Sequence, residues 1–219
     1  MTGYREIPPR LNITEEVLER PVVAGYGERT AISWSGGFIS YGELRWRVHS
    51  FARGLKELGV SPGDPVLIQM PNSPEFATVF LAAVKLGALP VVVNSLLGVQ
   101  EVQAIMTQTA PKLAITNSIC AQVLRELRGA MAIPTLICAG EAQADEIAFA
   151  SLVCEPQEEF ATRDTSAHEP AFVVCTSGTT GRPKCIVHAH RWIVALGDLN
   201  RYRLPPEPED VVMATGEWS

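Results

Sequence analysis

Nine consecutive residues, Thr176–Lys184, gather the side chains and glycines that bind phosphate. They read Thr-Ser-Gly-Thr-Thr-Gly-Arg-Pro-Lys, with hydroxyls on Thr176, Ser177, Thr179 and Thr180. Gly178 and Gly181 permit positive φ and close backbone approach, so successive N–H groups can point into one concavity. The hydroxyls rotate to fit phosphate oxygens, and Lys184 adds a mobile ammonium. Hydrogen bonds to a charged group contribute roughly 1.5–3 kcal/mol each, so three or four could hold a triphosphate at micromolar strength before the cost of ordering the loop is subtracted.

The local charge also favours an anion. Between Glu169 and Asp198 there is no acidic residue, whereas Arg182, Lys184 and Arg191 lie there. This stretch is +3 within a chain of net charge −6, so the remainder is −6 − 3 = −9. Charges are screened over about 8 Å at physiological salt, so the local sign decides what the loop attracts.

Two familiar phosphate loops do not fit the spacing. A Walker A loop needs four residues between its glycines and a Ser or Thr after the lysine. Here Gly178 and Gly181 are three apart, Lys184 follows three later, and Cys185 comes next. The dinucleotide pattern GxGxxG is absent as well. The alternative is a flexible surface loop rich in Ser, Thr and Gly, which the flanking strands and the acid-free surroundings disfavour.

The elements that must position this loop follow a strand–helix alternation. Apolar strand patterns fall at 66–70, 89–93, 112–116, 135–138, 171–175 and 185–187, and helical patterns at 74–86, 99–109, 119–127 and 191–199. Such alternation predicts an α/β fold, with a mostly parallel sheet covered by helices on both faces. The segment 141–169 breaks the rhythm, and we expect a surface helix followed by a solvated connection at 155–170.

The first 60 residues are predicted to form a leader, a hairpin and a helix. Asn12 and Glu15 have capping-box spacing for a short helix that Pro21 is expected to stop. The hairpin spans 31–39, with its turn at 36–37. Residues 61–219 are then expected to form the nucleotide-binding region, which carries loop 176–184. The helix after the hairpin is capped by Ser40 and Glu43 and presents one apolar stripe, made of Leu44, Val48, Phe51, Leu55 and Leu58.

Composition excludes several classes of protein. The chain has 219 residues, 47% hydrophobic and 19% charged, which is ordinary globular composition. The acidic balance argues against a nucleic-acid binder. The polar first 16 residues do not form a signal peptide, and Lys85 or Pro90 interrupts the apolar-rich stretches, so no membrane span is expected.

Cysteines and histidines are predicted to be structural. Five cysteines without CxxC spacing, an odd count, argue against a disulfide framework and for a reducing cytosol, so the location is predicted to be cytoplasmic. His188 and His190 would share a strand face, but no third ligand is evident and no metal site is predicted. His190 is expected to open the following helix. Cys120, Cys138 and Cys175 are interpreted as small hydrophobes.

The loop resembles the phosphate-loop signature of the adenylate-forming superfamily, which includes acyl-CoA synthetases, nonribosomal-peptide adenylation domains and luciferases. Four further stretches resemble that family's N-terminal region in the expected order, so the resemblance covers most of 22–215; they are SYGEL at 40–44, GD at 63–64, MPNSPEF at 70–76 and KLGALPVVV at 85–93. One departure is Cys185, where the family usually has glycine, and we expect the bulkier residue to stiffen the end of the loop. By this resemblance the β- and γ-phosphates of ATP are held by Thr176, Ser177, Gly178, Thr179, Thr180, Gly181 and Lys184.

The resemblance implies a two-step acid–thiol ligase reaction. The carboxylate of an acid attacks the α-phosphorus of ATP, which gives an acyl-adenylate and pyrophosphate, with Mg²⁺ assisting. A thiol, usually that of coenzyme A, then attacks the acyl carbon. The implied partners are therefore ATP, CoA and a small carboxylic acid, with no nucleic acid and no membrane span, and a homodimer is allowed. A benzoate-type acid and a medium-chain fatty acid both remain open.

The resemblance also implies that the adenylation lysine and the Mg²⁺-binding acid lie beyond Ser219. We therefore expect the isolated 219-residue chain to bind nucleotide weakly and to turn over slowly or not at all; steady acyl-CoA formation by the purified chain would contradict this. A non-catalytic interaction module of the same fold is the alternative from another class. A P-loop phosphotransferase is disfavoured by the glycine–lysine spacing.

Overall fold

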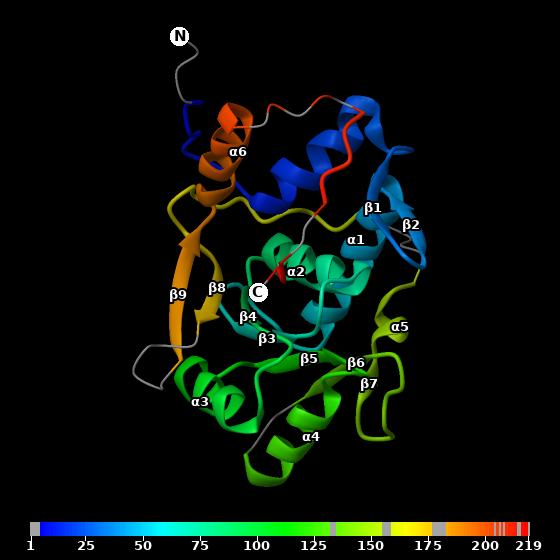
Figure 1. Ribbon diagram of the computed structural model, residues 1–219, viewed down its shortest axis with the longest axis vertical. Helices are drawn as coiled ribbons and strands as arrows, with labels where there is room; N and C mark the ends of the chain where they lie inside the picture. The colour runs from blue at the N-terminus through cyan, green and yellow to red at the C-terminus, as the bar shows by residue number, and fades with distance from the viewer. Residues whose placement is uncertain are drawn as a thin grey trace.

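A seven-stranded sheet forms the centre of the computed structural model, with strand order β7-β6-β5-β3-β4-β8-β9 (Figure 1). Neighbouring strands run parallel except β9, which is antiparallel to β8. The structure describes residues 5–131, 135–154, 159–176, 183–203, 205, 207, 209–213 and 216–218. The strands are β3 (Pro65–Gln69), β4 (Leu89–Val93), β5 (Leu113–Asn117), β6 (Leu136–Ala139), β7 (Ile147–Ala148), β8 (Pro170–Thr176) and β9 (Lys184–Ala189). This confirms the predicted α/β fold.

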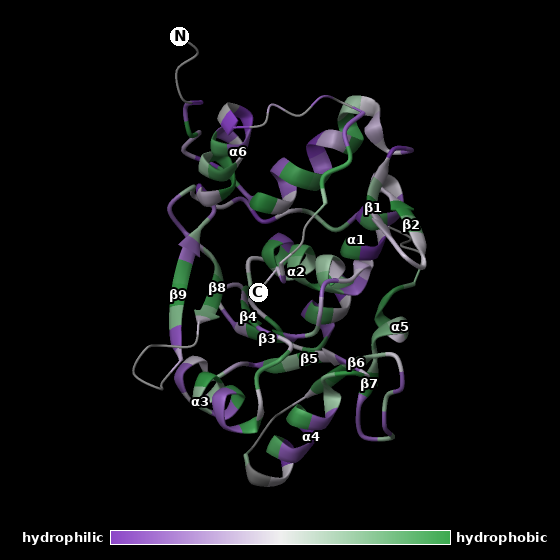
Figure 2. Cartoon of the chain, in the orientation of Figure 1, coloured by the Kyte–Doolittle hydropathy of each residue, from purple (hydrophilic) through white to green (hydrophobic). Residues whose placement is uncertain are grey.

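Helices cover both faces of the sheet. They are α1 (Tyr41–Glu57), α2 (Pro74–Leu86), α3 (Val99–Thr109), α4 (Ala121–Ala130), α5 (Phe149–Leu152) and α6 (Trp192–Arg203). Alternate residues of β3 point to opposite faces: Val66 and Ile68 pack with α1, α2 and α5, whereas Leu67 packs with α3 and α4. Two apolar layers therefore enclose the sheet, and the central strands are mostly hydrophobic (Figure 2).

Short polar side chains start the two helices on the first face. The Ser40 hydroxyl accepts the Glu43 N–H at 3.1 Å, and the Ser73 hydroxyl accepts the Phe76 N–H at 3.1 Å. Helix α2 ends at Gly87, whose φ of +84° requires glycine. A side chain at Gly87 would also meet Cδ of Arg163, 2.4 Å from the Cβ position. The predicted starts of α1 and α2 and the predicted end of α2 are thus confirmed.

The N-terminal segment differs from its prediction. Two π-helical stretches, η1 (Glu15–Glu19) and η2 (Val22–Tyr26), follow each other, with Pro21 in helical conformation between them. The Asn12 side chain accepts the N–H of Thr14 at 3.0 Å. The predicted capping box had paired Asn12 with Glu15 instead. The predicted stop at Pro21 is wrong, because Pro21 is the N-cap of η2, a position at which the helix does not require an N–H.

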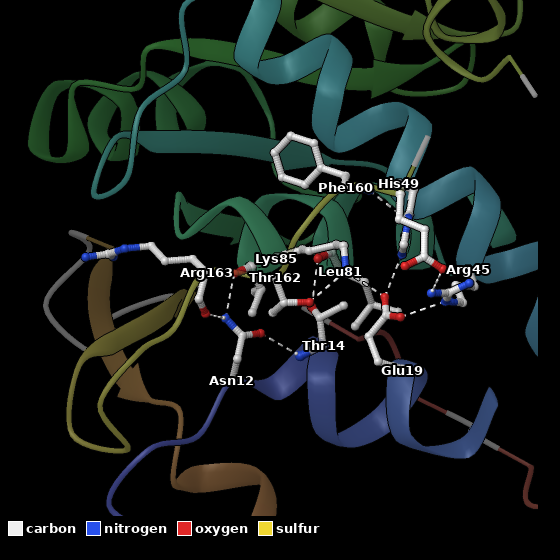
Figure 3. A network of polar contacts seen from close by, with 12 residues as sticks. Asn12, Thr14, Glu19, Arg45, His49, Leu81, Lys85, Phe160, Thr162 and Arg163 are labelled. Atoms are coloured by element: carbon white, nitrogen blue, oxygen red, sulfur yellow. Dashed lines mark hydrogen bonds and ion pairs between the residues drawn. The ribbon is translucent and has the colours of Figure 1, made fainter. Parts of the chain in front are cut away.

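A buried polar network ties this segment to the rest of the chain (Figure 3). The Glu19 carboxylate, 7% exposed, binds Nζ of Lys85 at 2.6 Å, Nε2 of His49 at 2.7 Å and Nε of Arg45 at 2.6 Å. The Lys85 ammonium also donates to the hydroxyl of Thr162 at 2.7 Å. The network joins η1, α1, α2 and the connection before β8 in one cluster.

The connection before β8 is a loop, as predicted for 155–170, but the part that the structure describes is only partly solvated. Residues 155–158 lie outside the described residues. Of the remainder, Thr165 is 2% and Ala167 is 1% exposed, and Phe160 packs against the core. The Thr165 hydroxyl donates to the carbonyl of Leu11 at 2.7 Å. A charged sequence is thus partly buried because its backbone and small side chains pair with the N-terminal segment.

Smaller differences concern element boundaries. The hairpin is formed by β1 (Thr30–Trp34) and β2 (Gly37–Ser40), and its turn lies at 35–36, one residue earlier than predicted. Helix α4 begins two residues later than expected, and β9 and α6 extend further than their patterns suggested. In the part of the chain that is described, none of the helices has the length and apolar character needed to cross a membrane.

Candidate nucleotide-binding site

Strand β8 brings the start of the predicted phosphate loop to the carboxyl edge of the sheet. Val173 and Cys175 point toward α3 and are buried, whereas Phe172 points to the opposite face. Thr176 is the last residue of β8 and is exposed. In open α/β sheets, ligands bind outside the carboxyl ends of the strands. The position of Thr176 is therefore the one expected of a ligand-binding loop.

The two described ends of the loop lie opposite each other. Thr176 pairs with Lys184 in the antiparallel register of β8 and β9, and its hydroxyl donates to the Lys184 carbonyl at 3.5 Å. Lys184 is exposed. These two predicted site residues are thus brought together. The other five predicted site residues lie outside the described residues, as does Arg182; they are Ser177, Gly178, Thr179, Thr180 and Gly181.

Helix α3 supports the end of the loop through a residue that the sequence analysis missed. The side-chain Nε2 of Gln108 donates to the carbonyl of Pro183 at 3.3 Å. Gln108 comes from the turn of α3 that follows Met106, on the helix that packs beneath β8. The only signal in the sequence was a polar residue beside the apolar stripe of a helix, which does not identify its partner.

A disulfide at the base of the loop corrects the interpretation of the cysteines. Cys175 and Cys185 are bonded, with Cα atoms 4.1 Å apart. Cys175 is therefore part of a disulfide and not the free apolar side chain that was predicted. An odd number of cysteines argues against a framework that pairs all of them, but it does not exclude a single disulfide. The missing signal was geometric: the two residues flank the nine-residue loop and fall in register across β8 and β9. Cys120 and Cys138 are buried free thiols, as predicted, and burial raises the pKa of both.

The histidines near the loop have packing contacts. The ring of His188 stacks on Phe172 with centroids 4.8 Å apart, and Trp192 meets Phe172 edge-on at 5.2 Å. His190 is 1% exposed, and its Nδ1 accepts the N–H of Ile13 at 3.2 Å. No group of three or more His, Cys, Asp or Glu side chains that could hold a metal occurs among the described residues.

A C-terminal segment covers part of the same edge of the sheet. The Asn72 side chain, just after β3, donates to the carbonyl of Gly216 at 2.8 Å and accepts the N–H of Trp218 at 2.8 Å. The N–H of Ser95, just after β4, donates to the Glu217 carboxylate at 3.1 Å. Local sequence patterns do not indicate these contacts, because they join residues more than a hundred positions apart. They place the exposed Glu217 carboxylate at the end of the sheet where β3 and β4 end.

The fold is an open, mostly parallel α/β sheet with helices on both faces, and its hydroxyl- and glycine-rich loop begins at the carboxyl end of β8. A family model described as "AMP-binding enzyme" matches residues 19–217, and the chain belongs to this family. The resemblance given by the loop and by the four earlier stretches is thereby confirmed.

The related proteins are CoA ligases. The chain is 28% identical over 208 residues to a 3-hydroxybenzoate–CoA ligase of Aromatoleum sp. (strain CIB), which covers 94% of this chain and 40% of that protein. It is 30% identical over 198 residues to a benzoate–CoA ligase of Thauera aromatica, covering 89% and 37%. The solved anthranilate CoA ligase AuaEII, in complex with anthranoyl-AMP, superposes with a TM-score of 0.79 at 26% identity, covering 84% and 36%. The chain thus spans about two fifths of the length of these relatives.

Proposed function

We propose that this chain is the ATP-phosphate-binding part of an AMP-forming acid–thiol ligase, with loop 176–184 as its phosphate site. The observation that carries the proposal is the pairing of Thr176 with Lys184 at the carboxyl end of β8, in a chain of the AMP-binding enzyme family. It places an exposed hydroxyl and an exposed ammonium at the two ends of the loop. The wider region 61–219 is proposed as the nucleotide-binding unit.

The described residues fit the phosphates of ATP. Among those residues Lys184 forms no ion pair, so its charge is available to an anion. The Thr176 hydroxyl makes only a long contact of 3.5 Å and can turn to a phosphate oxygen. These residues would orient the pyrophosphate that leaves when a carboxylate attacks the α-phosphorus, and they would neutralise part of its charge.

The proposed substrates are ATP, a small carboxylic acid and coenzyme A, with Mg²⁺ bound to the phosphates of ATP. Three features support this assignment: the family, the aryl-acid names of the relatives and the exposed cation at the loop. Among acids, an aromatic carboxylate is favoured because the two curated relatives described above are named for benzoate and 3-hydroxybenzoate. We propose a cytosolic location, where the free thiols of Cys120, Cys138 and Cys154 stay reduced.

Replacing Lys184 with alanine is expected to weaken ATP binding by about tenfold, a loss of roughly 1.4 kcal/mol, because the phosphate loses a direct ammonium contact. Isothermal calorimetry on the wild-type chain and the variant measures this. Lys112→Ala is the matched control. Lys112 is also exposed, but it lies just before β5, at the amino ends of the parallel strands and away from their carboxyl ends, where the loop begins. Equal affinities in wild type and Lys184→Ala would refute the phosphate role of the loop.

The competing proposal is a non-catalytic interaction module of the same fold. It would be favoured if neither the wild-type chain nor the variant bound ATP while the chain remained folded by circular dichroism. ATP binding that depends on Lys184 but not on Lys112 favours the ligase.

A further inference from the structure

One covalent bond encloses the whole phosphate loop. Cys175 on β8 and Cys185 on β9 face each other across the antiparallel pair and form a disulfide. The next pair toward the loop is Thr176 with Lys184, which are its first and last residues. The disulfide therefore closes a ring that contains all nine loop residues. It fixes the backbone at one end of the loop relative to the backbone at the other end.

We propose that the Cys175–Cys185 disulfide is a thiol-exchange site, opened by a low-molecular-weight thiol of the glutathione class, and that its redox state sets the affinity of the phosphate loop for nucleotide. The inference rests on the proposed function of the loop, and it adds a reactant and a form of regulation to that function. Three observations support it: the unequal exposure of the two sulfur-bearing residues, the position of the bond, and the length of the described side-chain contacts at the loop ends.

The two cysteines differ in their access to solvent. Cys175 is 5% exposed and packs beneath α3 with Val173 and Met106. Cys185 is only half-buried and lies on β9, which in the described part of the chain pairs with β8 alone. An attacking thiolate can therefore reach Sγ of Cys185 more readily than Sγ of Cys175.

The exchange is balanced in atoms and electrons. A thiolate RS⁻ attacks Sγ of Cys185 and forms a mixed disulfide on that residue. The S–S bond between the two cysteines breaks, and its electron pair leaves on Sγ of Cys175, which becomes a thiolate. A second RS⁻ attacks the sulfur of that RS group, which releases RSSR and the Cys185 thiolate. The two protons of the incoming thiols end on Cys175 and Cys185. The protein disulfide is thus reduced by two electrons, and two RSH are oxidised to RSSR.

Besides the backbone pairing of β8 with β9, the described side-chain contacts at the ends of the loop are long. The Thr176 hydroxyl reaches the Lys184 carbonyl only at 3.5 Å, and Gln108 donates to Pro183 at 3.3 Å. Residue 184 is the first of β9, where a strand frays when nothing restrains it. The disulfide restrains Lys184 one residue away. Opening it enlarges the set of conformations that binding must order, so the reduced form should bind phosphate more weakly.

The experiment compares the full chain in its oxidised form with the same chain reduced by dithiothreitol, using ATP as the calorimetric probe. We expect reduction to weaken ATP binding by about threefold to tenfold. Cys185→Ser should bind like the reduced chain and should not respond to the reductant. Cys154→Ser is the matched control, because Cys154 is an exposed free thiol remote in sequence from the loop, and it should respond as the wild type does.

Mass spectrometry after incubation with glutathione tests the chemistry separately. A glutathione adduct on Cys185 and not on Cys175 supports the proposed order of attack; alkylation of both cysteines in the air-oxidised chain, which means that no bond forms, overturns it. ATP affinity that depends on Lys184 but is equal in the oxidised and reduced chain contradicts this inference alone. Affinity that does not depend on Lys184 in either redox state contradicts the proposed function as well.

Discussion

Replacing Glu19 with alanine is expected to lower the free energy of unfolding by about 3–5 kcal/mol, the usual effect of leaving one partner of a buried ion pair without the other. The partner is Lys85, whose side chain is 1% exposed and whose ammonium lies 2.6 Å from the Glu19 carboxylate. After the change, the Thr162 hydroxyl would be the one group among the described residues that remains bonded to that ammonium. The buried charge would then have to be solvated or deprotonated at the expense of the fold.

The electrostatics of the network support a large effect. Burial alone would raise the pKa of Glu19, but hydrogen bonds from His49, Arg45 and Lys85 outweigh it and lower the pKa to about 2. His49 is a donor in this contact, because its Nδ1 accepts the N–H of Phe160 at 3.1 Å and leaves the hydrogen on Nε2. Burial lowers the pKa of Lys85, and the bond to Glu19 opposes that shift. Removing Glu19 removes the group that keeps Lys85 charged.

Urea unfolding at neutral pH measures the loss for Glu19→Ala. Glu159→Ala is the matched control, because Glu159 also binds Arg45 at 2.6 Å but is 76% exposed, and its removal should leave the unfolding midpoint almost unchanged. The double variant Glu19→Leu with Lys85→Met should recover at least half of the loss, because it leaves no unpaired charge in the core. A loss no larger than that of Glu159→Ala would show that the network does not stabilise the fold.

Local patterns in the sequence were sufficient to predict the sheet and its main helices. The hydroxyl caps Ser40 and Ser73 and the positive-φ residue Gly87 act within a few positions of their own element, so their residue types alone indicate where α1 and α2 begin or end. The periodic stripe of α1 and the apolar run of β4 are likewise local, and both elements appear where they were predicted.

Contacts between distant segments could not be predicted from local patterns. Glu19 and Lys85 are 66 positions apart. Neither residue type indicates a buried position, because Glu and Lys side chains are usually exposed. The disulfide at the loop is a second case. Its cysteines are only ten positions apart, but they are recognised as a pair only once the antiparallel register of β8 and β9 is known. The candidate site was therefore predicted by the residues of its loop, and the groups that hold the loop in place were not.

Stability should also fall as pH is lowered from 6.5 to about 4, because of His190. Its side chain is buried, and burial lowers the pKa of the imidazole to about 4 from an ordinary value of 6.5. Nδ1 accepts the N–H of Ile13 at 3.2 Å, and this contact requires an unprotonated nitrogen. The folded state therefore holds the neutral ring over a range of pH in which the unfolded chain binds a proton.

The sign and size of the effect follow from that difference. Between 6.5 and about 4 the unfolded chain binds more protons at residue 190, so unfolding becomes easier as pH falls. Each unit of pKa difference corresponds to about 1.4 kcal/mol, which gives a loss of roughly 3 kcal/mol across the whole window. The contribution of Glu19 is lost in a lower window, as pH falls from 4.5 to about 2, because the pKa of that group is also depressed in the fold.

Urea unfolding at several pH values through the upper window separates His190 from the other groups. His190→Gln keeps an acceptor for the Ile13 N–H but cannot take up a proton, so its stability should fall by about 2–3 kcal/mol less than that of the wild type over the same range. His168→Gln is the matched control, because His168 is exposed, and it should keep the wild-type slope. The same pH dependence in wild type and His190→Gln would mean that His190 is not the group responsible. A reduced slope would show that the contact from Ile13 to His190, which fixes the N-terminal segment beside β9 and α6, depends on a neutral imidazole.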